Sequence, residues 1–599
     1  MANTLANRTH TCGALRVEHE GQEVILKGWI TLRREHKNII FLDLGDRYGM
    51  TQLTLNTQEH PQLAALLPEL RLGTCIGVAG TVVDREKSGG SVNKQLATGA
   101  IEVIVSHTEI YGATKDLPFP IKDEIDASDL TRLKYRYLDL RRNPIARNIQ
   151  LRSKVTHAIR DYMHNQEFLE IETPILMKST PEGARDYLVP SREEPGHFYA
   201  LPQSPQLYKQ LLMIAGMDKY YQIARCFRDE DLRADRQPEF TQIDLEMSFV
   251  RDKDVHNVVE GMFVHIFREA MNIELTTPFP RMTYKEAMER FGEDKPDLRY
   301  GLELIDMTSV FAESGFGAFS GKCVKGIRVP NEAGRSKSWI KKLEKFIKQR
   351  GAGGLAWFKK LDSSWEASIK YFLGDGSAEL EAIEQITEAQ NNDLLFVVAH
   401  EKASSVNEWL SALRRKLAET LELIDSSKYA FLWIDEFPLV EETEDENGEK
   451  HLHMLHHPFT QPHPEDIDKI ETAPAEIRSI SYDLVLNGYE LGSGSLRVFD
   501  TELQTRLLKM VGIEQEEAEE RFGFFLEALK YGTPPHGGMG LGLDRIIMIL
   551  AGSDTLRDVI AFPKTQKAAC PMSEAPGSVD QQQLDDIHIA LAKKDKAEE

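Results

Sequence analysis

The chain has 599 residues, of which 41% are hydrophobic and 28% are charged. This length predicts about four domains, with enough apolar residues for several packed cores. Its 72 basic and 95 acidic side chains give a net charge of −23, which argues against a protein that coats nucleic acid indiscriminately but leaves room for a local RNA site.

The chain has no features of a membrane or secreted protein. Its longest apolar runs, such as 546–550, are far shorter than the ~20 residues of a membrane span, and its first residues lack a signal pattern. The five cysteines are scattered without a C-x-x-C pair, which predicts no disulfide and gives no zinc-ligand spacing. We therefore expect a cytoplasmic protein with no membrane partner.

The first 110 residues predict a small β-barrel. Alternating apolar and polar positions predict short strands at 23–31, 39–44, 50–55, 75–83 and 101–111, with a helix near 58–70. Five strands and one helix favour a Greek-key barrel of the OB type. The pattern alone does not decide between a nucleic-acid-binding barrel and one with no such role.

The middle of the chain predicts a hinge and a further domain. Prolines at 118 and 120 mark the hinge, and a helix from near Asn148 leads to an extended segment that ends at Pro174. Further on, the pattern predicts a helix at 338–349, a buried strand at 393–400 and a helix start in the capping-box sequence 405–408. The lysines of the helix at 338–349 are either a solvated face or an RNA contact.

Two arginine-bearing segments lie far apart in the chain. The first is Phe227-Arg228-Asp229-Glu230, and the second is the sequence Gly-Leu-Gly-Leu-Asp-Arg that ends at Arg545. Arginine suits a site that holds two anions together, because its planar fork makes paired, charge-assisted hydrogen bonds. The first segment alone is typical of a surface salt bridge. Its combination with the second is stronger evidence, because the glycines before Arg545 permit close approach of a nucleotide.

Together these segments resemble motifs 2 and 3 of the class II aminoacyl-tRNA synthetases. The sequences 204–209 (Ser-Pro-Gln-Leu-Tyr-Lys) and 494–497 (Gly-Ser-Leu-Arg) narrow the resemblance to the bacterial-type aspartyl-tRNA synthetases. The resemblance implies an α+β multidomain fold with an N-terminal OB-type barrel, an antiparallel-sheet catalytic domain and an inserted α/β domain. It implies an OB-fold anticodon-binding domain at 1–112, a hinge at 113–147, catalytic parts at 148–293 and 425–565, an insertion at 294–424 and a C-terminal extension at 566–599.

The resemblance also implies an activity and its partners. It predicts ATP-dependent attachment of L-aspartate to tRNA(Asp) through an aspartyl-adenylate, and it predicts a homodimer that forms through the motif 1 segment around Pro174. Whether tRNA(Asn) is also charged stays open. The alternatives are a catalytically inactive tRNA-binding paralogue and a synthetase for asparagine or lysine.

The resemblance assigns roles to individual residues. Arg228 and Arg545 are the expected catalytic residues. The expected aspartate contacts are Glu182, Ser204, Gln206, Lys209, Arg228, Gln242, Asp244, His456 and Arg497. The expected ATP contacts are Arg228, Asp229, Glu230, Gln237, Phe240, Glu490, Gly542, Leu543, Asp544 and Arg545. Lys209 and Arg497 would be the fixed cations that a buried aspartate side chain requires.

Two carboxylates are candidates to hold Mg²⁺. Asp483 and Glu490 flank the turn Asn487-Gly488, so a hairpin would bring them toward one another, and Mg²⁺ prefers such carboxylates together with phosphate oxygens. A structural acidic pair is the competing interpretation. His456 with His451 and His453 is an alternative metal cluster, but the spacing fits no zinc pattern.

The barrel carries the residues expected to read tRNA. By resemblance, Arg34, Phe41, Gln52 and Glu102 face the anticodon, and they offer a cation, a stacking ring and groups that read base edges. His36 and Gly90 match positions at which relatives that charge both tRNA(Asp) and tRNA(Asn) often carry histidine and glycine. We therefore favour relaxed specificity, although Lys37 and Asn38 depart from the glycine-rich sequence usual in that loop.

Overall fold

The computed structural model describes residues 5–180, 184–231, 235–362, 364–373, 378–444 and 448–592. The chain forms two compact units. The first unit contains Met1–Ser153, Leu232–Gln237 and Ile547–Val579, and the second contains Lys154–Asp231, Pro238–Ile546 and Asp580–Glu599. Within the described ranges, no helix is both long and apolar enough to cross a membrane.

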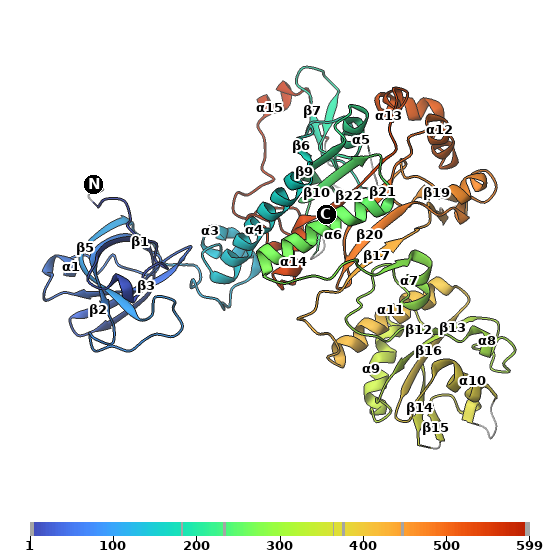
Figure 1. Cartoon of the computed structure of the whole chain (residues 1–599), viewed down its shortest axis with the longest axis horizontal. Helices are drawn as coiled ribbons and strands as arrows, with labels where there is room; N and C mark the ends of the chain where they lie inside the picture. The colour runs from blue at the N-terminus through green and yellow to red at the C-terminus, as the bar shows by residue number, and fades with distance from the viewer. Residues whose placement is uncertain are drawn as a thin grey trace. The chain divides into compact units, whose positions relative to one another are not determined.

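The first unit begins with a closed five-stranded barrel (Figure 1). Its strands, in the order β1-β2-β3-β5-β4, are β1 (Glu23–His36), β2 (Ile39–Asp46), β3 (Gly49–Asn56), β5 (Ile101–Gly112) and β4 (Cys75–Asp84). The inward side chains of all five strands form one apolar core. The predicted helix near 58–70 is reduced to α1 (Pro61–Ala64) and turns, so that expectation was wrong in length.

Two short helices and one long helix follow the barrel. The short ones are α2 (Asp129–Lys134) and α3 (Arg136–Asp139), and the long one is α4 (Asn143–Asn165). The short 3-10 helices η1 (Val17–His19) and η6 (Leu556–Asp558) lie elsewhere in the unit. The helix α4 begins earlier than predicted, because Pro144 suits the first turn of a helix. Arg136 is buried and donates to Asp139 and to the backbone oxygens of Arg557 and Ile560. These bonds join α3 to η6 and the residues just after it.

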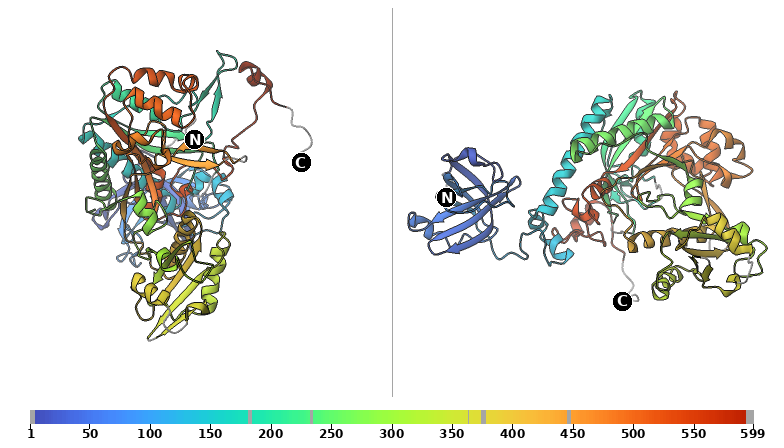
Figure 2. Two further views of the ribbon diagram at one scale, coloured as in Figure 1. Left: turned by 90° about the vertical axis from the view of Figure 1, so that its right-hand side faces the viewer. Right: turned by 60° about the horizontal axis from the view of Figure 1, so that its bottom comes forward.

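An eight-stranded sheet organises the second unit (Figure 2). Its order is β11 (Arg281–Thr283), β17 (Phe431–Asp435), β20 (Ser481–Leu486), β21 (Tyr489–Leu496), β22 (His536–Gly542), β10 (Glu239–Ser248), β9 (Lys219–Phe227) and β6 (Leu169–Glu170). The neighbours pair antiparallel except for the two end pairs, which are parallel. Asn487 and Gly488 both have positive φ, 53° and 82°, and form the predicted turn between β20 and β21.

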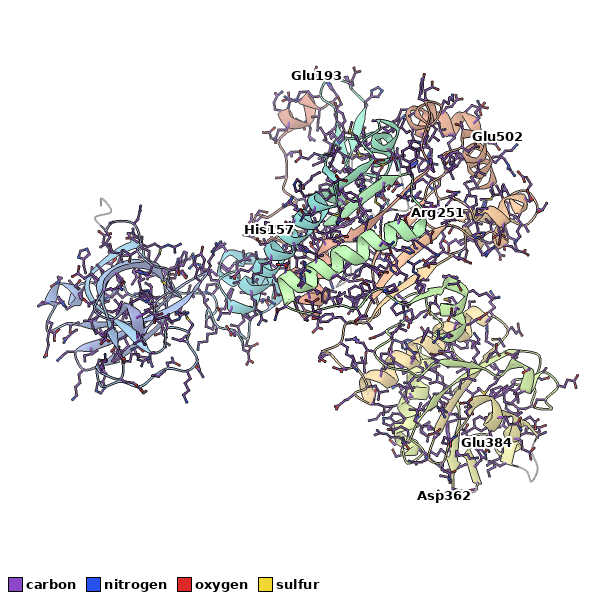
Figure 3. All side chains as sticks on the ribbon, in the orientation of Figure 1. His157, Glu193, Arg251, Asp362, Glu384 and Glu502 are labelled. Carbon is purple, nitrogen blue, oxygen red and sulfur yellow. The ribbon has the colours of Figure 1, made fainter. Side chains whose placement is uncertain are left out.

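Helices and small hairpins surround this sheet. They are α5 (Gln206–Ile214), α6 (Asp252–Ile266), η2 (Phe267–Met271), α7 (Tyr284–Arg290), α12 (Thr501–Met510), α13 (Gln515–Ala528), α14 (Leu543–Leu550), α15 (Gln581–Asp586), β7 (Leu188–Pro190) with β8 (Phe198–Ala200), β18 (Val440–Glu444) with β19 (Lys450–Met454), η4 (Pro464–Lys469) and η5 (Pro474–Glu476). In Figure 3, Arg251 lies directly before α6 and Glu502 lies on α12.

A five-stranded sheet is inserted between β11 and β17. Its order is β12 (Leu304–Asp306), β13 (Cys323–Val329), β16 (Leu394–His400), β14 (Ala356–Leu361) and β15 (Ser364–Ala367). One face packs on α9 (Lys337–Lys348) and α11 (Ala403–Thr420), and the other packs on α8 (Thr308–Phe311), α10 (Ala378–Thr387) and η3 (Lys370–Leu373). The helix predicted to start at the capping box 405–408 in fact starts at Ala403, so that sequence lies within its first turns.

Candidate active site

The central strands of the second unit place polar side chains opposite glycines. On β10, Gln242, Asp244 and Glu246 alternate and so share one face of the sheet. Their partners on β22 are Gly542, Gly540 and Gly538, in that order. A strand of glycines beside a strand of polar residues leaves space over the sheet for the polar side chains themselves.

Gly538 is required by this arrangement. A Cβ atom at that position would lie 2.1 Å from the backbone oxygen of Leu245 and 2.2 Å from Oε2 of Glu246. No side chain fits at those distances without moving the neighbouring strand. The glycine therefore makes room for the Glu246 carboxylate.

Two buried cations and two buried carboxylates lie at the base of this space. Lys209 and Arg497 are each 2% exposed. Lys209 Nζ donates to Asp244 Oδ1 at 2.8 Å and lies 3.3 Å from Glu246 Oε2. Arg497 donates to both Glu246 oxygens, at 2.8 and 3.1 Å, and to Ser495 Oγ at 2.7 Å. The predicted cations are present, and Glu246 bridges them.

The two carboxylates differ in the charge that surrounds them. Burial by itself raises the pKa of Glu246, but Arg497 and Lys209 together outweigh it, so that the pKa is lowered and the group is an anion. For Asp244 burial outweighs the attraction of Lys209, and its pKa is raised. The two pKa values shift in opposite directions because the guanidinium of Arg497 donates to both oxygens of Glu246 and makes no such pair of bonds to Asp244.

Several predicted aspartate contacts leave buried polar atoms without a partner. Within the described part of the chain, Asp244 Oδ2, Gln206 Nε2 and His456 Nε2 have no hydrogen bond. The other ring nitrogen of His456 lies 3.1 Å from Ser493 Oγ, and burial followed by the nearby Arg497 lowers the histidine pKa to about 4. Buried groups of this kind need partners, and a small polar ligand would supply them.

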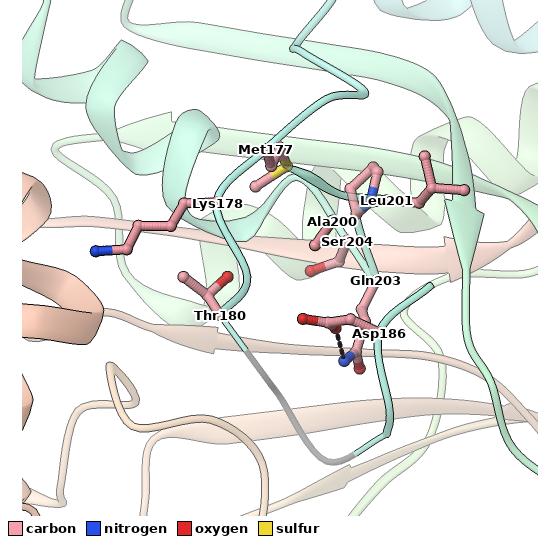
Figure 4. Close-up of a pocket in the computed structure, with 9 residues that line it drawn as sticks. Met177, Lys178, Thr180, Asp186, Ala200, Leu201, Gln203 and Ser204 are labelled. Carbon is pink, nitrogen blue, oxygen red and sulfur yellow. Dashed lines mark hydrogen bonds between the residues drawn. The ribbon is translucent and has the colours of Figure 1, made fainter. Parts of the chain in front are cut away.

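Ser204 lines a small pocket (Figure 4). Its neighbours there include Lys178 and Asp186, and Gln203 donates to Asp186 Oδ1 at 2.5 Å and to the backbone oxygen of Ala184 at 2.8 Å. Gln242 accepts a hydrogen bond from Cys226. Glu182, predicted to bind aspartate, lies outside the described residues.

Three of the predicted nucleotide contacts, Arg228, Phe240 and Asp544, lie where β9, β10 and α14 meet. Arg228 follows β9, and its guanidinium carbon lies 5.0 Å from the centre of the Phe240 ring. Its Nε is buried and has no hydrogen-bond partner among the described residues. Asp544 Oδ2 accepts from the backbone N–H of Thr241 at 2.8 Å, which fixes the start of α14 against β10.

The second predicted arginine is held by β21. Arg545 donates to the backbone oxygen of Glu490. Leu543 is buried and Gly542 closes β22, so the turn into α14 is tight. Asp229 forms an ion pair with Arg185 at 3.5 Å, and Glu230 follows it in a partly exposed segment. Gln237 lies in the first unit, where its amide exchanges hydrogen bonds with the backbone of Lys564.

Asp483 and Glu490 form an acidic pair on neighbouring strands. They are not directly opposite, because a bulge after Leu484 pairs Asp483 with Ser493 and Glu490 with Val485. Burial and then the charge of Glu490 raise the pKa of Asp483 well above its usual range, and its Oδ1 has no partner within the described residues. Two mutually repelling carboxylates with a free buried oxygen fit a divalent cation. No described group of three or more His, Cys, Asp or Glu residues is arranged to hold a metal.

In the first unit, the predicted anticodon residues share one face of the barrel. Arg34, Phe41 and Thr54 lie side by side on β1, β2 and β3. Arg34 donates to Gln52 Oε1 at 3.2 Å, and Gln52 Nε2 donates to Glu102 Oε2 at 2.9 Å. Phe41 is half-buried. A ring beside a cation, an amide and a carboxylate is the chemistry that stacks and reads an unpaired base.

The two residues predicted to control tRNA choice lie in turns. His36 is exposed at the end of β1, and Lys37, with φ of 54°, closes a tight turn to β2. Gly90 donates its N–H to the backbone oxygen of Arg85 at 2.7 Å, and a Cβ there would approach that oxygen to 3.1 Å. A larger residue at 90 would therefore displace this turn slightly.

Sequence reasoning missed two members of the buried network. Glu246 is one, and its signal was present, because Asp244 and Glu246 are two residues apart on a strand and must share a face. His457 is the other: its Nε2 contacts Arg497, and burial lowers its pKa well below the usual value. Nothing in the spacing distinguished His457 from the predicted His456.

Comparison with known proteins agrees with this geometry. A profile described as tRNA synthetases class II (D, K and N) matches residues 128–566, and one described as OB-fold nucleic acid binding domain matches residues 24–111. The chain belongs to the class II tRNA synthetases. This result confirms the predicted family and the predicted fold class.

The matches to similar proteins extend over nearly all of both chains. An aspartate–tRNA(Asp/Asn) ligase of Caldanaerobacter subterraneus is 49% identical over 98% of both chains, and one of Desulfatibacillum aliphaticivorans is 49% identical over 100% of both. Among solved structures, the asparaginyl-tRNA synthetase of Pyrococcus horikoshii with asparaginyl-adenylate covers 93% of this chain and 98% of its own, with a TM-score of 0.58 and 18% identity. That likeness concerns the fold.

Proposed function

We propose that this synthetase activates L-aspartate with ATP and attaches it to tRNA. The observation that carries the proposal is the buried pair Lys209 and Arg497, fixed by Asp244 and Glu246. Fixed cations in a buried site suit an anionic side chain, whereas asparagine would bring no charge to interact with them. The names of the relatives, which specify aspartate, support the same substrate.

The described residues account for each requirement of activation. Lys209 and Arg497 hold the substrate side chain, while the free Oδ2 of Asp244 accepts from its α-ammonium group. Arg228, with its unpaired Nε, donates to the α-phosphate and to the reacting carboxylate, and Phe240 stacks on the adenine. The carboxylate attacks the α-phosphorus in line and pyrophosphate leaves. No protein nucleophile is needed, because orientation and charge stabilisation supply the rate.

We further propose that Asp483 and Glu490 hold Mg²⁺ when ATP is bound. A bound Mg²⁺ would neutralise charge on the phosphate oxygens as pyrophosphate forms. Arg545 is anchored on the backbone oxygen of Glu490. In this proposal it would contact the far end of the triphosphate.

The second step transfers aspartate to tRNA in the cytoplasm. We propose that the barrel face around Phe41 reads the anticodon and that both tRNA(Asp) and tRNA(Asn) are charged. We also propose that the domain boundaries are those implied by the family resemblance, at 1–112, 113–147, 148–293, 294–424, 425–565 and 566–599. The support is His36 and Gly90 in the two turns, together with relatives named for both tRNAs. Histidine can bond to several base edges, so relaxed reading is physically reasonable.

We also propose a homodimer. Large apolar side chains are about half exposed on β6 and on the β7–β8 hairpin, among them Leu169, Leu188 and Phe198. Backbone hydrogen bonds between Met177 and Ala200 join the segment after β6 to β8. A patch of this kind fits a second copy of the chain. A monomer-sized species alone in sedimentation at micromolar concentration would contradict it.

ATP–pyrophosphate exchange tests the central proposal. Exchange should depend on L-aspartate, and asparagine or lysine should support it at least about a hundredfold less well. Purified tRNA(Asp) and tRNA(Asn) should then be charged with efficiencies within about a thousandfold of one another, which is ~4 kcal/mol of transition-state discrimination. Exchange without dependence on aspartate would reject the substrate, and a larger ratio would reject dual specificity.

A further inference from the structure

The turn between β2 and β3 carries an exposed aromatic ring between two arginines. Tyr48 is 51% exposed. The guanidinium carbons of Arg47 and Arg8 lie 4.6 and 5.6 Å from the centre of its ring, and Arg47 Nη2 donates to the tyrosine hydroxyl at 2.6 Å. Cation–π contact keeps both arginines extended at the surface.

Asp46 builds this cluster into the barrel. Its Oδ1 accepts from the backbone N–H of Tyr48 at 2.8 Å, which sets the turn. Its Oδ2 accepts from Arg8 at 3.1 Å and from the backbone N–H of Cys12 at 2.9 Å. One carboxylate therefore ties the N-terminal arm to the turn and holds Arg8 beside the ring.

Two glycines allow the arm to lie this close. A Cβ at Gly13 would be 2.0 Å from the backbone oxygen of Tyr48, and one at Gly49 would be 2.8 Å from the Cα of Gly13. Gly49 also has φ of 148°. The arm and the turn fit together only without side chains there, so Arg8 is placed by the backbone and not by a flexible tail.

The helix α4 adds a third arginine nearby. Gln150 donates to the backbone oxygen of Arg47 at 3.4 Å, which sets this face of α4 against the turn. Arg147 lies one turn before Gln150 on the same face and is exposed. Three arginines thus accompany one aspartate, on a chain whose net charge is −23.

We propose that Arg8, Arg47, Tyr48 and Arg147, here called the turn cluster, bind the phosphate backbone of tRNA away from the anticodon. The proposal rests on the proposed function, which makes tRNA the substrate. Asp46 lies five residues beyond Phe41 on β2, about 16 Å at ~3.3 Å per residue. An RNA with its anticodon on Phe41 would therefore meet the turn cluster several nucleotides away. Arginine forks suit phosphates, and contacts of this kind orient an RNA without reading its sequence.

The double variant Arg8→Ala/Arg47→Ala tests the proposal in the full-length protein. Its affinity for tRNA(Asp) transcript should fall about tenfold, and the slope of log K against log salt should flatten by about 1 to 2. A transcript with a substituted anticodon should lose affinity by the same factor, since phosphate contacts carry no sequence information. Tyr48→Leu should show a smaller loss. Aspartate-dependent ATP–pyrophosphate exchange should be unchanged.

Arg71→Ala is the matched control. Arg71 is another exposed barrel arginine in an ion pair with a single aspartate, Asp116, at 3.5 Å. It should change tRNA affinity by less than about twofold. Wild-type affinity and salt slope in Arg8→Ala/Arg47→Ala, an equal loss in Arg71→Ala, or a loss confined to the cognate anticodon would each overturn the turn cluster as a phosphate site. Absence of aspartate-dependent exchange in the unmodified protein would overturn the proposed function instead.

Discussion

Arg497 in the second unit is 2% exposed and bonds both oxygens of Glu246, whereas Arg34 on the barrel is 56% exposed on its side chain and donates to Gln52 at 3.2 Å. The buried arginine is held by a full countercharge, since an unpaired charge in that position would cost several kcal/mol. The exposed arginine needs no such partner, because water solvates it.

This difference separates two kinds of recognition. The buried site holds Lys209 on Asp244 and Arg497 on Glu246 before any ligand enters, so a substrate must fit a fixed arrangement. The barrel face leaves its cation and ring accessible, and in the proposed complex an RNA base completes the contacts. Large single-residue effects are therefore expected in the pocket and small ones on the barrel.

Arg497→Ala should have the largest effect. Its loss removes the proposed partner of the substrate side chain and leaves the buried Glu246 without its bidentate countercharge. Aspartate activation should weaken by roughly 3–5 kcal/mol, measured as kcat/KM in aspartate-dependent ATP–pyrophosphate exchange. Arg497→Lys, which keeps the charge without the fork, should recover part of the loss. Near-normal exchange in Arg497→Ala would remove this residue from the substrate site.

Gly538→Ala tests whether the pocket depends on close strand packing. The added methyl group would meet Leu245 and the Glu246 carboxylate at about 2 Å, so we expect a loss of about 1–3 kcal/mol in unfolding free energy, together with reduced exchange. Gly523→Ala is the control, since nothing lies within 4 Å of a Cβ there and Gly523 is helical. That control should be neutral or stabilising by about 0.5–1 kcal/mol. Equal behaviour of the two variants would show that the glycine strand is not required.

Asp435→Asn tests a half-buried carboxylate whose pKa is raised by its surroundings. Burial raises the pKa of Asp435 to about 7. Its Oδ1 lies 3.6 Å from Nε2 of His256. The folded state then holds a proton between pH ~4 and ~7 that the unfolded state has lost, so this group's contribution to stability falls as pH rises. The side chain is 25% exposed, and we expect about 2 kcal/mol of loss between pH 5 and 8.

Chemical unfolding of the wild type and Asp435→Asn at both pH values isolates this contribution. Burial lowers the pKa of His256 to about 3, which gives the opposite trend below pH ~6.5, but that histidine is present in both proteins. The wild type should therefore lose more stability than the variant between pH 5 and 8. Parallel pH profiles would show that Asp435 is ionised in the folded protein.

Gln52→Ala should have the smallest effect. The variant removes one reader of a base edge, but Glu102 keeps hydrogen bonds from Thr54 at 2.6 Å and from Ser88 at 2.8 Å, so the face stays ordered. Charging of tRNA(Asp) should lose about 1 kcal/mol in kcat/KM, with exchange unchanged. A loss as large as that of Arg497→Ala would mean that the barrel is as strictly organised as the pocket.

Local sequence patterns predicted the elements that local chemistry controls. The five barrel strands follow from alternation, and the turn at Asn487 and Gly488 follows from two residues that tolerate positive φ. The starts of two helices were predicted wrongly from the sequence. The capping sequence 405–408 lies inside α11, and Pro144 opens α4 before the predicted start.

The sequence by itself determined the family motifs, the barrel and the residues that supply charge to the pocket. Tertiary structure decided how those charges are balanced. Glu246 lies between Lys209 and Arg497, and Arg497 is 251 positions after Glu246 in the chain. A bulge after Leu484 sets the offset of Asp483 from Glu490. No local pattern records such contacts, because strand order and register determine which distant side chains share a face, and burial then determines which of them must be paired.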